Sequence, residues 1–363
     1  LRASVAAGLA RSLIVARDYE EARRRGANIV VFNPLKERGL ERFTDPQSPV
    51  EMLTRSSTKI ATQYHQVKLG GDLGLSVAGA ESNVAIGLAR LGHRVRWAGR
   101  VGADELGELV LRTLRAEGID TSHAVVDDTG RPTGLLLTEP RLGTLTRVSY
   151  YRAGSAGSAL AAADVLSALT SGTRILHLTG ITPALSATAA EAALSAATAA
   201  RGAGITVCLD VNYRSRLWSS DRARTALRPI LSHTDLLIAS EDELPLVREQ
   251  PDVPEPKAVH TLLAEGVGEV VVKRGARGAT VFTADATTDR AARQVDAVDL
   301  VGAGDAFVAG YLSGLLQDAD VPARLHRAVT TAAFAVATRG DWEGLPTRHE
   351  LALLDEPDGT TVR

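Results

Sequence analysis

Asp299-Leu-Val-Gly-Ala-Gly-Asp-Ala-Phe307 marks the place where an apolar segment gives way to a predicted helix. Three small residues, Gly302, Ala303 and Gly304, precede the acid Asp305. Such a turn exposes successive backbone N–H groups at a helix N-terminus, which favours a phosphate or the charge that develops on it. An ionised Asp305 beside these donors could accept a proton from a hydroxyl nucleophile, as phosphoryl transfer requires. The alternative interpretation is a glycine-rich helix start with a capping acid.

On both sides of this turn, apolar runs of strand length alternate with amphipathic segments of helix length. The predicted strands are 95–101, 174–178, 205–209, 235–238 and 269–272, and the predicted helices are 82–91, 104–117, 303–316 and 322–338. This alternation predicts an α/β fold with a mostly parallel sheet covered by helices. Between residues 133 and 152, two β-prone pieces joined by a turn with Pro and Gly predict a hairpin outside the main sheet.

The charge balance and the cysteine count limit the classes of partner. Lys and Arg total 41 against 43 Asp and Glu in 363 residues, which gives no electrostatic reason to expect nucleic acid or an anionic membrane as partner. No apolar run of about 18 residues predicts a membrane span. The single cysteine, Cys208, allows no internal disulfide, which is typical of a reducing compartment. The sequence therefore predicts a cytoplasmic protein that binds a small molecule.

A second turn, Gly79-Ala-Glu-Ser-Asn83, opens a predicted helix far upstream of Asp305. Gly79 and Asn83 lie where a close backbone approach and an amide could meet the hydroxyls of a polyol. Together the two turns resemble the signature regions of the ribokinase/PfkB family of carbohydrate kinases. The resemblance covers residues 76–345. It is closest to 2-keto-3-deoxygluconate kinases, through Val77-Ala-Gly-Ala-Glu-Ser-Asn83, Tyr150-Tyr-Arg-Ala-Gly-Ser-Ala156 and Asp210-Val-Asn-Tyr-Arg214.

This resemblance implies a three-layer α/β/α fold with a small β lid, and a site that uses ATP and Mg²⁺. Asp305 would be the catalytic base, and Gly302, Ala303 and Gly304 would form the anion hole. Glu243 would organise Mg²⁺ through water, although Ser240 stands where the family usually has Asn. For Glu243, an exposed acidic helix start is the alternative. The residues implied for ATP are Ser240, Lys273, Gly275 and Gly278, and those implied for the sugar are Gly79, Ala80, Asn83, Tyr150, Arg152 and Arg214.

The two arginines of the implied sugar site favour an acidic sugar. A guanidinium binds a carboxylate with two parallel hydrogen bonds, and a neutral sugar offers it no such charge. A surface or interdomain salt bridge is the alternative role for Arg152 and Arg214, and Tyr150 alone would more often be a packing residue. Lids of this family often pair, so a homo-oligomer is a further expectation.

Residues 1–75 depart from the family pattern. The central first strand, with its acidic contact and lid strands, is not recognisable there, so the first strand and part of the lid are expected to be missing or replaced. The stretch from Gly26 to Asp72 instead resembles an internal piece of molybdopterin-dependent oxidoreductases related to formate dehydrogenase alpha subunits. Two explanations remain open: a misjoined gene, or a fusion in which residues 28–32 replace the strand. The expected organisation is a foreign segment 1–75, a kinase domain 76–345 with its lid hairpin at about 133–152, and a tail 346–363.

The leading hypothesis for function is ATP-dependent phosphorylation of a hydroxyl of 2-keto-3-deoxygluconate or a close sugar acid. The alternatives are a kinase for a neutral sugar or nucleoside, and a catalytically impaired sugar-binding remnant. A molybdenum oxidoreductase is a more remote one, because residues 1–75 are too short for such a domain.

Overall fold

The computed structural model describes residues 50–54, 57–62, 73–142, 145–248 and 253–356 of the chain. The chain divides into two units, 1–47 and 48–363, and every described residue belongs to the second. The strand-like segment 28–32 therefore lies outside the described residues.

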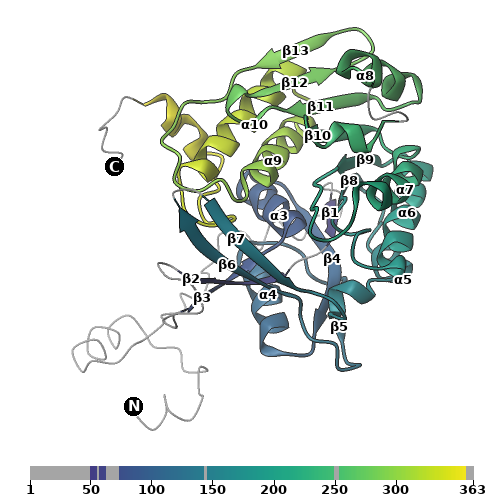
Figure 1. Ribbon diagram of the computed structural model, residues 1–363, viewed down its shortest axis with the longest axis vertical. Coiled ribbons are helices and arrows are strands. Elements are labelled where there is room, and N and C mark those ends of the chain that lie inside the picture. The colour runs from purple at the N-terminus through teal and green to yellow at the C-terminus, as the bar shows by residue number, and fades with distance from the viewer. Residues whose placement is uncertain (1–49, 55–56, 63–72, 143–144, 249–252, 357–363) are drawn as a thin grey trace. The chain divides into compact units, whose positions relative to one another are not determined.

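A central sheet of nine strands, counted over the described residues, forms the middle of the second unit (Figure 1). The strands are β1 (Val50–Thr54), β4 (Val95–Gly102), β5 (Ala124–Asp127), β8 (Thr173–Thr179), β9 (Thr206–Asp210), β10 (Leu236–Ser240), β11 (Glu269–Lys273), β12 (Ala279–Phe282) and β13 (Thr287–Arg290). Their order is β13-β12-β11-β10-β9-β8-β1-β4-β5. All neighbours from β11 to β5 are parallel, whereas β12 and β13 add an antiparallel hairpin at one edge.

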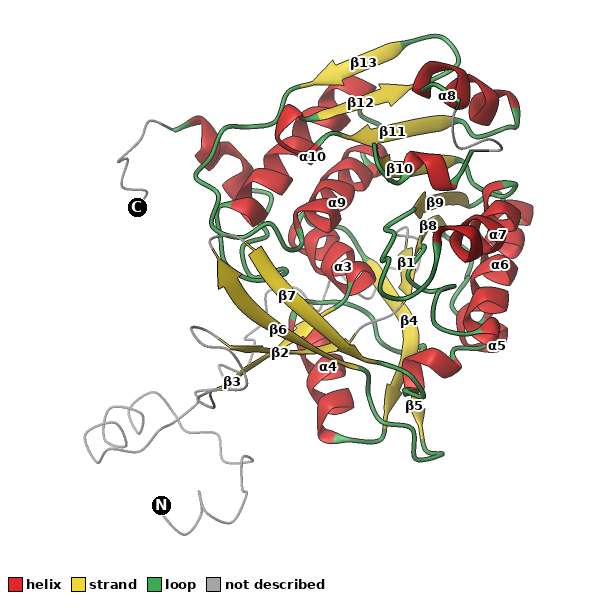
Figure 2. Cartoon of the chain, viewed as in Figure 1, coloured by secondary structure: helices red, strands yellow, loops and turns green. Residues whose placement is uncertain are grey.

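Helices cover both faces of this sheet (Figure 2). One apolar core joins a sheet face to α3 (Ala80–Arg90), α4 (Glu105–Ala116), α9 (Ala303–Leu316) and α10 (Val321–Val336). A second core joins the other face to α5 (Ala162–Leu166), α6 (Ala187–Gly202), α7 (Ser220–Leu231) and α8 (Glu255–Ala264). Alternate strand residues enter the two cores: Cys208 packs in the first, whereas Val207 and Leu209 pack in the second. The result is the expected three-layer α/β/α fold.

A separate sheet contains four strands within the described residues, in the order β3-β2-β6-β7. The strands are β2 (Ser57–Thr62), β3 (Leu73–Ala78), β6 (Leu135–Leu142) and β7 (Leu145–Tyr151). β6 and β7 pair antiparallel, with Leu135 opposite Tyr151, and they form the hairpin predicted outside the main sheet. We call these four strands the lid.

The expectation that the first strand and part of the lid are missing is wrong. β1 lies between β4 and β8 and is parallel to both, with Leu53 opposite Trp97 on one side and His177 on the other. β2 and β3 form the antiparallel pair that completes the lid. The α/β unit thus begins before residue 76. β1 is short, and its position depends on hydrogen bonds to two strands distant in sequence, which leave no periodic signal in the segment itself.

Local signals account for the helix boundaries. Asp104 caps α4 by accepting a hydrogen bond from the backbone N–H of Gly107 at 2.7 Å. Gly92 and Gly118, which follow the ends of α3 and α4, have φ angles of 89° and 77°, as helix-terminating glycines do. After α10 the chain returns to α3, where the Arg348 N–H donates to the carbonyl of Arg90 at 3.2 Å. Within the described residues, no helix is long and apolar enough to cross a membrane.

Candidate active site

Three neighbouring parallel strands end in polar residues at one edge of the central sheet. Asp210 ends β9, Ser240 ends β10 and Lys273 ends β11. The register pairs Asp210 with Ile238 and Ser240 with Lys273, so the three side chains share the face on which α9 packs. The carboxyl edge of parallel strands is where open α/β sheets generally bind ligands.

α9 begins at this edge with the Gly-Ala-Gly-Asp turn. Gly302 has φ 78° and ψ −10°, and a Cβ atom at this residue would lie 2.0 Å from the carbonyl oxygen of Asp341. Only glycine fits there. Ala303 and Gly304 are the first two residues of α9, and the first N–H groups of a helix have no acceptor within it. The turn can therefore offer backbone donors to an anion.

Asp299 stabilises this turn through hydrogen bonds to the backbone. One carboxylate oxygen accepts the N–H of Val301 at 3.1 Å, and the other accepts the N–H of Gly340 at 3.2 Å. Both carboxylate oxygens thus accept hydrogen bonds from the backbone. These bonds link the segment before α9 to the loop that follows α10.

Asp305 lies in the first turn of α9 and is only 7% exposed. Its Oδ2 accepts a hydrogen bond from Asn83 Nδ2 at 2.7 Å, and its Oδ1 accepts one from Asn212 Nδ2 at 3.3 Å. Burial raises the pKa of Asp305 to about 7, although the Asn83 hydrogen bond and the charge of Arg214 oppose the shift. A carboxyl group with this pKa can gain and lose a proton near neutral pH, as a general base must.

Lys273 lies between the end of the sheet and the start of α9. Its Nζ is 2.8 Å from Asp210 Oδ1, and a Cβ atom at Gly304 would be 3.7 Å from the same Nζ. Burial alone would lower the pKa of Lys273, but the carboxylates of Asp210 and Glu243 outweigh it and raise the pKa above its usual value. A positive charge therefore lies beside the predicted anion hole.

Glu243 accepts hydrogen bonds from the end of β10 and from the loop that follows β9, rather than facing solvent. Its Oε1 accepts the N–H of Tyr213 and its Oε2 accepts the N–H of Ser240, each at 2.8 Å. The side chain is 7% exposed, so the alternative of an exposed acidic helix start does not describe it. Each oxygen keeps one further lone pair, and water-mediated organisation of Mg²⁺ fits this arrangement better than direct coordination.

Two of the residues expected to hold a sugar acid, Tyr150 and Arg152, lie together at the end of β7. The Arg152 guanidinium lies 4.2 Å from the centre of the Tyr150 ring, and Arg152 is 9% exposed. Among the described residues, its Nε has no hydrogen-bond partner. The charge of Arg214 acts on the pKa of both Arg152 and Asp305, so Arg214 lies near both side chains. A surface salt bridge is thus not the observed role of Arg152.

The start of α3 contributes the remaining predicted sugar residues. Gly79 precedes the helix, Ala80 is its first residue, and the N–H of Asn83 returns to the carbonyl of Gly79 at 2.8 Å. Glu81, which is 1% exposed, accepts hydrogen bonds from the hydroxyls of Thr179 at 2.7 Å and Thr182 at 2.8 Å. α3 is therefore anchored to the end of β8, and its Asn83 side chain donates a hydrogen bond to Asp305.

Gly275 and Gly278 form the turn between β11 and β12. Both have positive φ angles, 57° and 98°, and a Cβ atom at Gly278 would lie 1.9 Å from the carbonyl oxygen of Arg290. Gly278 is therefore required by the approach of the chain after β13. Arg274 links the turn to α8 through an ion pair with Glu255, and to the end of β10 through one with Glu241.

Sequence reasoning did not single out Asp210, Asn212 or Glu81 as site residues. Each carried a usable signal: Asp210 and Asn212 follow directly after the apolar run of β9, and Glu81 lies inside the Gly79 turn. Asn212 also has φ 38°, unusual for a residue other than glycine. Only the fold shows that two of these side chains reach Asp305 or Lys273.

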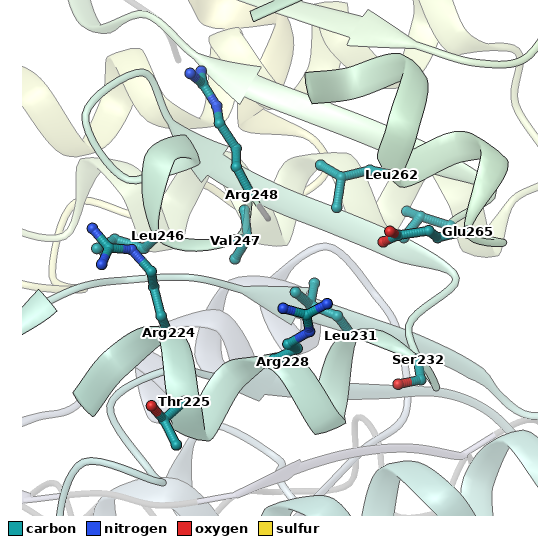
Figure 3. A pocket seen from close by; sticks show the side chains of 11 residues that line it. Arg224, Thr225, Arg228, Leu231, Ser232, Leu246, Val247, Arg248, Leu262 and Glu265 are labelled. Atoms are coloured by element: carbon teal, nitrogen blue, oxygen red, sulfur yellow. The ribbon is translucent and has the colours of Figure 1, made fainter. Parts of the chain in front are cut away.

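A cavity of about 460 Å³ lies elsewhere, between α7 and α8 (Figure 3). Arg224, Arg228 and Arg248 line it together with Leu246 and Leu262. It contains none of the predicted site residues. The arrangement of base, lysine and helix N-terminus, rather than cavity size, therefore identifies the candidate active site.

The chain is similar to known carbohydrate kinases. A 2-dehydro-3-deoxygluconokinase from Bacillus subtilis is 36% identical over 278 residues, covering 76% of this chain and 85% of that protein. One from Thermoproteus tenax is 38% identical over 287 residues, covering 77% and 85%. A ribokinase II-type structure from E. coli, solved with ATP and Mg²⁺, has a TM-score of 0.79 at 25% identity, covering 85% of this chain and 99% of that one.

Residues 52–348 match the model of the pfkB family carbohydrate kinases. Residues 52–75, expected to be foreign, lie inside this match, which corrects that expectation and agrees with the pairing of β1, β2 and β3. The match covers the whole candidate site and most of the chain. The chain therefore belongs to the PfkB family and is an ATP-dependent carbohydrate kinase.

Proposed function

We propose that this kinase transfers the γ-phosphate of ATP to a hydroxyl group of a sugar acid of the 2-keto-3-deoxygluconate type. The observation that carries the proposal is the buried Arg152, stacked on Tyr150 and near Arg214, with Nε lacking a partner among the described residues. A buried guanidinium keeps its charge, and although the Glu81 carboxylate also acts on Arg152, its Nε–H is available to donate to an anionic group of the substrate. The two relatives named 2-dehydro-3-deoxygluconokinase support the same acceptor class.

In this proposal Asp305 removes the proton from the acceptor hydroxyl while the oxygen of that hydroxyl forms a bond to the γ-phosphorus. The bond from that phosphorus to the β–γ bridging oxygen breaks, and ADP leaves with the electron pair. The N–H groups of Gly302, Ala303 and Gly304 stabilise the charge on the transferring group. Asn83 and Asn212 orient the base through their hydrogen bonds to its two oxygens.

The remaining predicted residues hold the nucleotide. Lys273 supplies positive charge beside the anion hole, and Ser240, Gly275 and Gly278 belong to the strand ends and turn at the same edge. Mg²⁺, organised through water near Glu243, would neutralise charge on the phosphates. The chain's own contribution is to place these groups on rigid strand ends.

The test compares acceptors in a kinase assay with purified protein, and then compares arginine variants. We expect turnover with 2-keto-3-deoxygluconate to exceed turnover with ribose or fructose. Arg214→Ala should raise the KM for the sugar acid at least about tenfold, as expected for a lost charge-assisted contact, and change the KM for ATP little. Arg222→Ala, on the exposed side of α7, is the matched control and should change neither. Preference for a neutral sugar, or an unchanged acceptor KM in Arg214→Ala, would contradict the proposal.

A further inference from the structure

A buried ion pair lies directly behind the predicted anion hole. Asp210 is 1% exposed, and its Oδ1 is 2.8 Å from the Nζ of Lys273, whose side chain is 15% exposed. The two residues are not on neighbouring strands, because β10 lies between β9 and β11. The Lys273 side chain therefore reaches back across β10 to meet Asp210.

The position of the ammonium group indicates why the pair exists. A Cβ atom at Gly304 would be 3.7 Å from Nζ. Because glycine has no side chain, the ammonium group lies close to the backbone of Gly304. Gly304 is also the residue before Asp305. A phosphate bound at the start of α9 would thus lie against Lys273, whose ammonium is also paired with Asp210.

Asp210 also affects which carboxylate forms an ion pair with the Lys273 ammonium. Burial would lower the pKa of Lys273, and Asp210 is the largest contributor that raises it again. Asp305 and Glu243 are close enough to act on Lys273 as well. Without Asp210, the ammonium could turn toward Asp305 and neutralise the base.

We propose that Asp210 is a positioning residue of the transfer reaction: its carboxylate anchors the Lys273 ammonium at the start of α9, where it meets the transferring phosphate. This inference rests on the proposed function for the location of the phosphate, but not for the identity of the sugar. It assigns Asp210 no contact with substrate and no proton transfer.

The test is a double-mutant cycle on Asp210→Asn, Lys273→Gln and the double variant. Loss of a donor to the transferring group costs about 10²–10³ in kcat, which is expected for Lys273→Gln. Asp210→Asn should cost roughly 10-fold to 100-fold, as a supporting residue does, with the KM for the sugar acid within about threefold. The double variant should be no slower than Lys273→Gln, because Asp210 acts only through the lysine.

Binding of a non-hydrolysable ATP analogue with Mg²⁺, measured by calorimetry without sugar, provides a second readout. Asp210→Asn should weaken it in the parent background and leave it unchanged in the Lys273→Gln background. Asp127→Asn is the matched control, since Asp127 is equally buried and 2.9 Å from Arg100 but lies on the edge strand β5. It should lower thermal stability without changing kcat or analogue binding.

Two results would overturn the inference while leaving the proposed function intact. In the first, the losses of kcat caused by Asp210→Asn and Lys273→Gln multiply in the double variant. In the second, Asp210→Asn has the same kinetics as Asp127→Asn. If Asp210→Asn leaves its buried lysine unpaired and fails to fold, the double variant, which has no unpaired charge, is compared with Lys273→Gln alone. Equal activity then supports the inference, and a further loss contradicts it. A parent that binds no nucleotide would contradict both the inference and the proposed function.

Discussion

Asp305 combines burial with a need to ionise, and these two properties oppose each other. Burial favours the neutral carboxyl group, whereas a general base must start as the carboxylate. The hydrogen bond from Asn83 and the nearby charge of Arg214 oppose the effect of burial on the pKa of Asp305. The outcome is a pKa of about 7, which lies in the range where a base is most effective.

Replacement of Asp305 by Asn keeps the size of the side chain but removes its ability to take a proton. General-base loss typically costs 10²–10⁴-fold in rate, so kcat for Asp305→Asn should fall by about that factor, with ATP affinity within a few-fold. Asp299→Asn should cost less, because Asp299 holds only backbone N–H groups. Near-parental kcat in Asp305→Asn, with folding confirmed by circular dichroism, would show that Asp305 is not the base.

The pH dependence of the parent follows from the same carboxyl group. Since the base acts only when deprotonated, kcat/KM should rise with pH and level off above the pKa of about 7. Below that pH it should fall about tenfold per unit. The residual activity of Asp305→Asn should lack this acid limb. An acid limb that persists in the variant would assign the titration to another group.

At the scale of elements, the first turn of α9 depends on one glycine and one loop. Gly302 brings the backbone so close to Asp341 that a side chain cannot enter, and the N-terminus of α9 is thereby aimed at the carboxyl edge of the sheet. The Asp299 carboxylate accepts a hydrogen bond from the N–H of Gly340, next to Asp341, and so links the same two segments. The helix start is therefore fixed before any phosphate binds.

Gly302→Ala should therefore damage both stability and catalysis. Gly204→Ala is the matched control, because Gly204 also has a positive φ angle, 72°, but has no atom within 4 Å of the added Cβ. The left-handed conformation alone costs about 1–2 kcal/mol, which both variants share. We expect urea denaturation to show a larger loss for Gly302→Ala, together with a lower kcat. Equal losses of stability would mean that the loop of Asp341 can move away.

At the scale of the whole molecule, β1 joins β4 and β5 to the six other described strands of the central sheet. It pairs with β4 on one side and β8 on the other, so its removal would leave unpaired backbone groups on both strands in the middle of the sheet. β2 and β3 in addition supply half of the described lid. The unit that contains these strands begins at residue 48.

Two truncated chains test this boundary. A chain that starts at residue 48 should keep the soluble yield and kinase activity of the whole chain, because it retains every described strand. A chain that starts at residue 76 lacks β1 and β2 and should be insoluble or inactive. Soluble yield, near-UV circular dichroism and kcat measure the difference. Activity in the shorter chain would mean that β1 is dispensable, and loss of activity in the longer one would assign residues 1–47 a role in the fold.

The sequence alone determined the features that depend on local pattern. Apolar periodicity located β4, β8, β9, β10 and β11 and the helices between them, and the small residues of the Gly302 turn predicted a helix N-terminus suited to phosphate. These signals are readable because turn chemistry and periodicity act within a few residues. The resemblance to PfkB kinases rested on the same turns, and the family match confirms it.

Only the tertiary structure decided the features that depend on contacts distant in sequence. The strand-like segment 28–32 is more continuously apolar than β1, yet residues 50–54 form the interior strand between β4 and β8, because hydrogen bonds to these two strands select them. Asn83 reaches Asp305 across 222 residues, and Asp210 meets Lys273 across 63. Such pairings are set by the packing of whole layers, which no local pattern records.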